Sequence, residues 1–214
     1  LKGLNFSIEK GKFVVITGPS MCGKTTLVYC LSGVIPHIID GKMRGNVFVD
    51  GRSTKEVELS WIMRKVGVIL QNPEAQIFGM TVEEDLYFAL ENLGFEETVA
   101  RKRVEKFLKM FELDRFRKKN PMALSGGQKQ KLAIASVLAV EPEILILDEP
   151  FSNLDFKSRE SILKVLERLK REGKTIILIE RSFYDFSHLI DEILVLNNGK
   201  LLGVFSPNEF FENE

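Results

Sequence analysis

The sequence predicts an α/β protein built on a mainly parallel sheet. Short runs rich in leucine and β-branched residues alternate with longer stretches of helical periodicity along the 214 residues. Most of the short runs are apolar almost throughout, which is typical of parallel strands covered on both faces. Hydrophobic residues make up 44% of the chain, so it can bury a sizeable core. We expect residues 1–214 to form one domain.

Seven of the short runs are expected to be strands. The last two flank the tripeptide Asn197-Asn198-Gly199, whose left-handed turn propensity predicts a β-hairpin. The expected strands are Phe13–Thr17, Asn46–Asp50, Val66–Leu70, Ile144–Leu147, Thr175–Ile179, Glu192–Leu196 and Lys200–Phe205.

Five stretches with helical periodicity lie between these strands. In the last of them Ile162, Leu166 and Leu169 share one face. Residues 80–120 contain only helical, highly charged sequence, which predicts a helical subdomain inserted into the α/β core. The expected helices are Lys24–Leu31, Thr81–Asn92, Glu96–Phe111, Gly126–Val140 and Phe156–Arg171.

Composition argues against several classes of protein. Thirty lysines and arginines cancel thirty aspartates and glutamates, which gives no support for binding to nucleic acid through bulk charge. The longest apolar run, Leu132–Val140, has nine residues, whereas crossing a bilayer takes about 18–20. Cys22 and Cys30 show neither a disulfide framework nor a metal-ligand spacing. We therefore expect no nucleic-acid partner and no membrane span.

The segment Gly18–Thr25, GPSMCGKT, matches the P-loop pattern G-x-x-x-x-G-K-[ST] and lies between an expected strand and an expected helix. Glycines let backbone N–H groups approach phosphate oxygens, Lys24 adds a positive charge, and the Thr25 hydroxyl can bind Mg²⁺. A plain turn with a solvated lysine is the alternative, and the flanking elements argue against it. The candidate nucleotide-binding residues are Gly18, Pro19, Ser20, Met21, Cys22, Gly23, Lys24, Thr25 and Thr26.

Two carboxylates follow the buried strand Ile144–Leu147. Ligands of open α/β sheets lie beyond the carboxyl ends of the strands, which is where Asp148 and Glu149 emerge. Asp148 suits the Mg²⁺ shell, and Glu149 could polarise an attacking water. The sequence Asp-Glu-Pro is also a plausible strand terminator, although the P-loop favours the functional interpretation.

A second helix begins with the pentapeptide LSGGQ at Leu124–Gln128. Ser125 is an ordinary helix N-cap, and a capped helix start exposes the same N–H groups that bind an anion. The chain thus has two helix starts suited to phosphate, about a hundred residues apart. One nucleotide could use both within one chain, or each could serve a different nucleotide, and the spacing does not choose.

The ordered set of GPSMCGKT, Gln71, LSGGQ, ILILDEP and Ser152-Asn-Leu-Asp155 resembles the nucleotide-binding subunits of ABC transporters over almost the whole chain. The resemblance implies a P-loop NTPase core, a small antiparallel β-subdomain and the inserted helical subdomain. It also implies that two subunits pair head to tail around ATP and Mg²⁺, so the second helix start acts on the partner's ATP. The residues acting in this way would be Ser125, Gly126, Gly127 and Gln128.

Further roles follow from the same resemblance. Gln71 looks like the glutamine near the Mg²⁺ and the attacking water, so it is both a catalytic and a metal candidate alongside Thr25 and Asp148. Asp155 looks like the family's aspartate at the subunit interface, although it could equally cap the following helix.

The stretch from Gln71 to Asp85 is similar to the ATPases of energy-coupling-factor importers, which take up vitamins and transition-metal ions. This resemblance implies integral membrane partner subunits and a peripheral place on the cytoplasmic face of the membrane. Ile77 and Phe78 could form an apolar groove for a membrane partner, or could anchor the helical subdomain, and the residues do not decide. The transported substrate is not encoded here, nor is the choice between a homodimer and a heterodimer.

Two positions depart from the family pattern. Met21 stands where transporter P-loops usually have glycine, and we expect it to be tolerated. Arg181 stands where the family usually has a histidine that contacts the γ-phosphate. Arginine can donate to phosphate but cannot accept a proton, so we expect ATP binding with reduced turnover.

This leaves three functional hypotheses. The first is a hydrolysing motor subunit of an importer, with Glu149, Gln71 and Arg181 as the catalytic candidates. The second is an ATP-gated partner with impaired hydrolysis, which Arg181 favours and the intact Glu149 opposes. The third is a nucleic-acid-linked ABC ATPase, against which stand the neutral charge and the lack of sustained heptads between Lys24 and Leu124.

Overall fold

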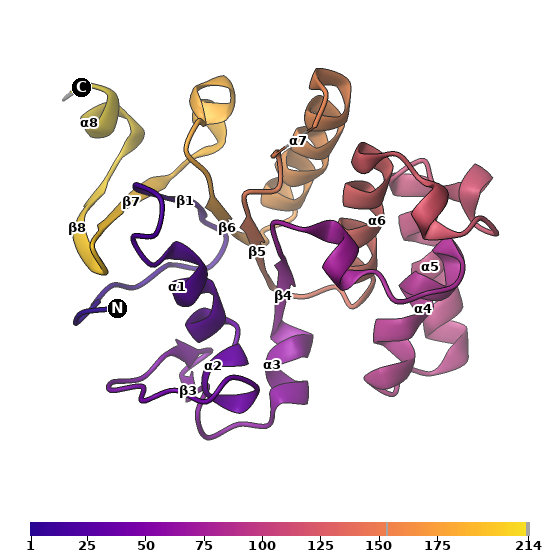
Figure 1. The fold of residues 1–214 in the computed structure, drawn as a ribbon, viewed down its shortest axis with the longest axis horizontal. Helices are drawn as coiled ribbons and strands as arrows, with labels where there is room; N and C mark the ends of the chain where they lie inside the picture. Colours follow the sequence, from indigo (N-terminus) through magenta and orange to yellow (C-terminus); the bar gives the residue numbers. More distant parts are fainter. Residues whose placement is uncertain (153, 213–214) are drawn as a thin grey trace.

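A six-stranded sheet forms the centre of the protein. The computed structural model describes residues 1–152 and 154–212. In the strand order β4-β5-β6-β1-β7-β8, neighbouring strands are parallel except for the antiparallel hairpin β7–β8 (Figure 1). This confirms the predicted, mainly parallel sheet and the predicted hairpin. The strands are β1 (Phe13–Thr17), β4 (Val66–Ile69), β5 (Ile144–Asp148), β6 (Thr175–Ile179), β7 (Glu192–Asn197) and β8 (Lys200–Phe205).

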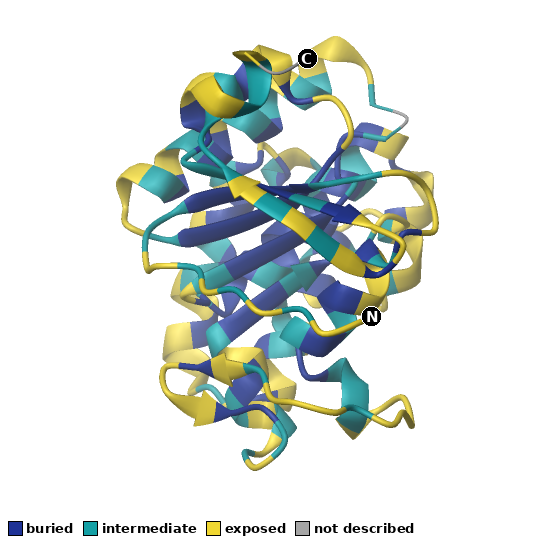
Figure 2. Cartoon of the chain, turned by 90° about the vertical axis from the view of Figure 1, so that its left-hand side faces the viewer, coloured by how far each residue is buried: buried dark blue, intermediate teal, exposed yellow. Residues whose placement is uncertain are grey.

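Successive residues of the central strands point into two separate cores. On β1, Val14 and Ile16 face the core that includes α1 (Lys24–Leu31) and α3 (Leu59–Lys65). Phe13 and Val15 face the opposite core, beneath α6 (Gly126–Ala139) and α7 (Phe156–Arg171). Figure 2 shows the central strands as almost wholly buried. Because both faces are covered by helices, the strands are apolar at nearly every position rather than at alternate ones.

A second, two-stranded antiparallel sheet is formed by β2 (Phe48–Val49) and β3 (Arg52–Ser53). The predicted strand Asn46–Asp50 is too long, because Asp50 and Gly51 adopt positive φ values of 48° and 74° and form the turn. The prediction also missed three helices of at most seven residues, too short to show a helical period. They are α2 (Val34–His37), α3 and α8 (Pro207–Glu212).

The helical subdomain is formed by α4 (Val82–Asn92) and α5 (Glu97–Met110), which pack against each other and against α6 (Figure 1). Two short 3-10 helices, Asp114–Phe116 and Pro121–Ala123, lead from α5 to α6. Thr81 caps α4 in a reciprocal pair with Glu84, which explains why this helix begins one residue later than predicted. The contact between α4 and α6 joins the subdomain to the core.

Helix α6 is buried along most of its length, as its apolar composition predicts. Leu132, Ile134 and Ala135 are fully buried, and Leu138 nearly so. In the part of the chain that the structure describes, no helix is both long enough and apolar enough to cross a bilayer.

Candidate nucleotide site at the carboxyl edge of the sheet

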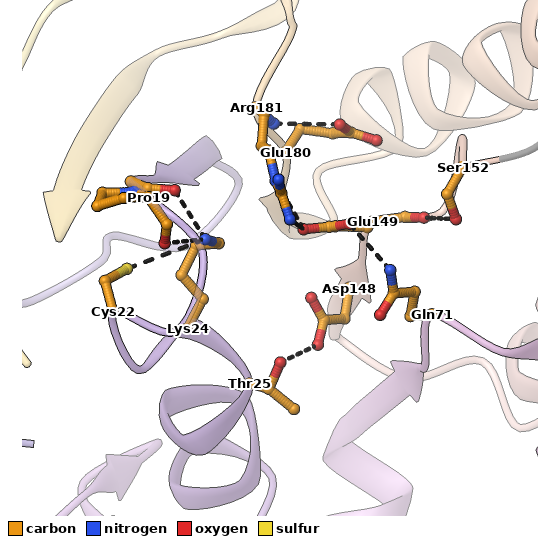
Figure 3. A network of polar contacts seen from close by, with 11 residues as sticks. Pro19, Cys22, Lys24, Thr25, Gln71, Asp148, Glu149, Ser152, Glu180 and Arg181 are labelled. Atoms are coloured by element: carbon orange, nitrogen blue, oxygen red, sulfur yellow. Dashed lines mark hydrogen bonds and ion pairs between the residues drawn. The ribbon is translucent and has the colours of Figure 1, made fainter. Parts of the chain in front are cut away.

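The loop between β1 and α1 folds around the amine of Lys24. This amine donates to the carbonyl oxygens of Gly18 (2.8 Å) and Pro19 (2.9 Å) and lies 3.9 Å from Sγ of Cys22 (Figure 3). The lysine is only 6% exposed. Its charge is therefore held inside the loop by weak neutral acceptors, which phosphate oxygens would replace with stronger charge-assisted bonds.

Backbone conformation opens this loop to an anion. Gly18 has φ of 147°, and a Cβ there would lie 2.0 Å from the carbonyl oxygen of Leu196, so only glycine fits. Gly23 caps α1 without any side-chain hydrogen bond to the helix start. Among the described residues, no side chain thus caps the first N–H groups of α1 in competition with a ligand.

Two of the three predicted Mg²⁺ ligands, Thr25 and Asp148, face each other across the start of α1 and the end of β5. Thr25 Oγ1 donates to Asp148 Oδ2 at 2.9 Å (Figure 3). Burial raises the pKa of Asp148, which is 4% exposed, so its charged form lacks adequate solvation here. A hydroxyl and a destabilised carboxylate fit a divalent cation, which would compensate the buried charge. Among the described residues no three His, Cys, Asp or Glu side chains form a metal cluster, so other ligands, such as phosphate oxygens and the third predicted ligand Gln71, would complete the shell.

The carboxylate of Glu149 is held by the other two predicted catalytic residues. Gln71 Nε2 donates to Glu149 Oε2 at 3.0 Å, and Arg181 donates from Nε (3.2 Å) and Nη2 (3.1 Å) to Oε1 (Figure 3). The backbone N–H of Glu149 donates to the carbonyl of Ile179 at 3.0 Å, although its φ of 46° is left-handed. The structure therefore brings together three side chains from three separate chain segments.

The second helix start lies elsewhere. Ser125 caps α6, accepting the Gln128 N–H at 3.3 Å and donating its own N–H to Gln128 Oε1 at 3.0 Å. A Cβ on Gly127 would lie 2.3 Å from the hydroxyl of Ser158 in the first turn of α7, whereas Gly126 faces open space. Helices α1 and α6 contribute to opposite cores and so cover opposite faces of the sheet (Figure 1).

Asp155 caps α7, as one of its two predicted roles requires. It accepts the backbone N–H of Ser158 at 2.9 Å and the Ser158 hydroxyl at 2.8 Å. The start of α6 packs at Gly127 against the hydroxyl of Ser158. Asp155 holds this hydroxyl in place by accepting its hydrogen bond. Asn153 of the same motif lies outside the described residues.

Comparison with known proteins identifies this architecture. Residues 1–152 match the sequence profile of the family described as ABC transporter. The chain belongs to the ABC transporter family. It is 44% identical over its 214 residues to a "Putative ABC transporter ATP-binding protein" of Pyrococcus abyssi, covering 76% of that protein. It is 45% identical to a protein of the same description from Pyrococcus horikoshii, again over its full length and 75% of the relative.

Solved structures of ABC proteins agree with the fold. CbiO1 from Clostridium perfringens, described as part of the ABC transporter complex cbiONQ, superposes with a TM-score of 0.85 at 31% identity, over 99% of this chain and 84% of that one. The ATP-binding cassette MJ0796, solved as a dimer bound to ADP and Pi, gives 0.83 at 30% identity, over 97% and 90% of the two chains. The chain is the ATP-binding subunit of an ABC transporter, an ATPase.

The sequence analysis gave no role to two further residues, Glu180 and Ser152, that contact the predicted catalytic residues. Glu180 is 8% exposed, accepts the N–H of Arg181 at 3.2 Å, and has its pKa raised by burial. The hydroxyl of Ser152 donates to the Glu149 carbonyl at 2.9 Å. An acid directly after an apolar strand was the available signal for Glu180, since Asp148 follows the neighbouring strand in the same way.

The departure at Met21 has a backbone consequence. Its φ of 62° is left-handed, and its side chain is fully exposed. Glycine at this position of ABC P-loops avoids the steric penalty of about 1–2 kcal/mol that an L-residue meets there. Met21 is therefore held in a strained conformation, and its tolerance in the P-loop stays a prediction.

Proposed function

We propose that this chain drives an importer of the energy-coupling-factor type by binding and hydrolysing ATP–Mg²⁺ between two head-to-tail cassettes. The observation that carries the proposal is the convergence of Asp148 and Glu149 on the P-loop threonine and on Gln71. This convergence supports a metal-binding pair and a water-activating pair at one edge of the sheet, as phosphoryl transfer to water requires.

Each side chain then has a separate task. Lys24 and the open N–H groups of α1 bind the phosphates, and Thr25 with Asp148 would hold Mg²⁺, which neutralises charge on the phosphates when bound. Glu149 accepts the proton of the attacking water, and Gln71 orients that water. The remaining P-loop residues, Pro19, Ser20, Met21, Cys22 and Thr26, shape the cradle.

The second helix start acts on the partner's nucleotide. Because α1 and α6 cover opposite faces of the sheet, Ser125 to Gln128 are poorly placed for the nucleotide on their own chain's P-loop. The similar cassette MJ0796 is dimeric. We infer that Ser125, Gly126 and Gly127 close over the ATP of a paired cassette, with Asp155 at the same interface. Residues 1–214 would form one such cassette, with 80–120 as its helical insertion.

The importer class rests on the Gln71–Asp85 stretch, on the likeness to cbiO1, and on an exposed apolar surface beside α4. Phe78 is 65% exposed and stacks on Phe88 at a ring-centroid distance of 5.3 Å, and Met80 is exposed nearby in the sequence. Ile77 is buried and packs in the core, which favours an anchoring role for Ile77. The alternative, contact with a membrane partner, then applies to Phe78 alone. Phe78 is thus available to an integral membrane subunit, which would keep the chain on the cytoplasmic face of the membrane.

A variant of the proposed base tests this function. Glu149→Gln should lower steady-state ATP hydrolysis by about 10²- to 10⁴-fold, while ATP–Mg²⁺ binding persists and drives dimer formation in size-exclusion chromatography. Identifying the membrane proteins that co-purify with the chain tests the importer class. Undiminished hydrolysis by Glu149→Gln would contradict the assigned base, and recovery of nucleic acid in place of membrane subunits would favour the third hypothesis.

The ion pair between Arg181 and Glu149 favours a second candidate, an ATP-gated partner with slow hydrolysis. Arg181 occupies the carboxylate oxygen to which an attacking water would otherwise donate, so the ion pair must open before that oxygen can accept from water. Single-turnover hydrolysis with the isolated chain and with its partner cassette separates the two candidates. If this chain is an ATP-gated partner, single-turnover hydrolysis should be slow in the isolated chain and fast only when the partner cassette is added.

A further inference from the structure

The carboxylate of Asp85 is a buried meeting point of three hydrogen-bond donors. Asp85 lies in the first turn of α4 and is 3% exposed. Its Oδ1 accepts the backbone N–H groups of Phe78 (2.8 Å) and Gly79 (3.0 Å), and its Oδ2 accepts the hydroxyl of Ser136 at 2.6 Å. Neither Asp85 nor Ser136 has a role in the nucleotide site described above.

The segment around Phe78 is fixed on both sides. Before it, Gln76 exchanges two hydrogen bonds with the backbone of Val68 and Leu70 (2.9 and 2.7 Å) at the end of β4. After it, Gly79 packs so closely that a Cβ there would lie 2.4 Å from the backbone nitrogen of Asp85. The exposed ring of Phe78 is therefore carried on a backbone that cannot move independently of the Asp85 carboxylate.

The third donor belongs to the helix that begins at the LSGGQ sequence. Ser136 lies eleven residues after Ser125 in α6, a distance of about 16 Å along a helix. A second contact joins the same two parts of the chain, since Lys129 of α6 forms an ion pair with Glu74 at 2.5 Å. Because α6 is a continuous, buried helix, a displacement at Ser136 also displaces its N-terminus.

We propose that Asp85 is a positioning residue that couples residues 77–79 to α6 through Ser136. The proposal rests on the proposed function, in which Phe78 meets a membrane subunit and α6 presents Ser125 to the partner's ATP. A buried carboxylate that loses one donor is left partly unsatisfied, which costs free energy. The three hydrogen bonds of Asp85 therefore tend to persist together and to restrict relative movement of residues 77–79 and α6. Such coupling is reciprocal, so nucleotide binding must change the environment of residues 77–79 even without a membrane subunit.

Hydrogen exchange of the whole chain measures this coupling. With Mg²⁺ and the non-hydrolysable analogue AMP-PNP, we expect slower exchange in the P-loop, at the start of α6 and at the amides of Phe78 and Gly79. In Ser136→Ala the first two responses should remain, while the response of Phe78 and Gly79 falls by at least about twofold. Asp85→Asn should keep the response, because its Oδ1 still accepts both N–H groups and its Nδ2 can donate to Ser136.

A matched control separates coupling from general destabilisation. Val104 is fully buried in α5 of the same subdomain, so Val104→Ala lowers stability through a cavity without removing any bond of Asp85. This variant should keep the response of Phe78 and Gly79. The proposal is overturned if Ser136→Ala keeps that response too, or if the native chain protects its P-loop without any change at these two amides. Absence of P-loop protection in the native chain would overturn the proposed function itself, and this proposal with it.

Discussion

Two nitrogen atoms of Arg181 donate hydrogen bonds to one carboxylate oxygen of Glu149. Nε and Nη2 lie 3.2 and 3.1 Å from Glu149 Oε1, while Gln71 engages the other carboxylate oxygen. Both oxygens of the proposed base are thus occupied by donors, with which an attacking water would have to compete for the same lone pairs. The histidine usual in ABC proteins has no such fork and can also accept a proton.

Arg181→His should therefore raise the steady-state ATPase rate. The gain should be about 2- to 5-fold, because the arginine side chain is 56% exposed and such solvated ion pairs contribute at most about 1 kcal/mol. Phosphate release under saturating ATP–Mg²⁺ measures it. Arg181→Lys, which keeps the charge but loses the fork, should give an intermediate rate, and an unchanged or lower rate in the histidine variant would refute the inhibitory role of the pair.

Asp148→Asn should raise the melting temperature of the nucleotide-free chain at pH 7. Burial raises the pKa of this carboxyl above its unfolded value, against the lowering effect of the Thr25 hydrogen bond. The folded chain therefore binds more protons at Asp148 than the unfolded chain, so its contribution to stability is lost as the pH rises from about 3.9 through the raised pKa. The amide variant lacks this loss because it carries no charge.

The melting temperature of Asp148→Asn should not rise when ATP–Mg²⁺ is added, whereas that of the native chain should rise on addition of ATP–Mg²⁺. Calorimetry at pH 5 and pH 7, with and without ATP–Mg²⁺, measures both effects. A lower melting temperature for Asp148→Asn without nucleotide would show that the carboxylate stabilises the empty site.

Phe78→Ala should uncouple transport while basal ATPase and the melting temperature stay nearly unchanged, because this ring is mostly exposed. The neighbouring Ile77→Ala provides the contrast. Ile77 is 7% exposed and packs in the core, so its truncation should lower the free energy of unfolding by about 2–5 kcal/mol. The ratio of ATPase activity with and without the co-purified membrane subunits gives the coupling, and a native ratio in Phe78→Ala would count against this docking surface.

Met21→Gly should stabilise the chain by about 0.5–1 kcal/mol. The substitution relieves a left-handed φ of 62° that penalises an L-residue, and this gain exceeds the entropy that a glycine loses on folding. The fully exposed methionine side chain gives up no packing. Denaturant unfolding measures the change, with Ser20→Gly, which lies outside the left-handed positions, as a control that should be neutral or destabilising.

Much of the fold could be predicted because local signals agree with the tertiary arrangement. The bounds of β1, α1 and α7 match the predictions, since glycine, a capping Asp155 and continuous apolar runs mark their ends. Residues such as Asp50 were misplaced because a turn through positive φ leaves no clear mark inside an apolar run. Short α3 is stabilised by burial of Ile62 rather than by periodicity, so its sequence gave little sign of a helix.

The candidate site also has features that could be predicted from the sequence and features that could not. Motif spacing and the family resemblance predicted candidate residues for the chemistry, and in the structure Thr25 contacts Asp148 and Gln71 contacts Glu149. The bidentate hold of Arg181 on Glu149 could not be predicted, because it depends on two loops from adjacent strands meeting in space. Asp85 escaped notice for a similar reason, since its donors come from residues up to 51 positions away.

The bond from the Glu149 amide to the Ile179 carbonyl continues the β5–β6 ladder one step past the strand end. The main chain beneath the proposed base is therefore tied to the sheet, whereas Gln71 and Arg181 lie on segments beyond the ends of β4 and β6. A change in the contacts of the Glu149 carboxylate then requires movement of those two neighbours or of the Glu149 side chain, and no movement of the main chain beneath it.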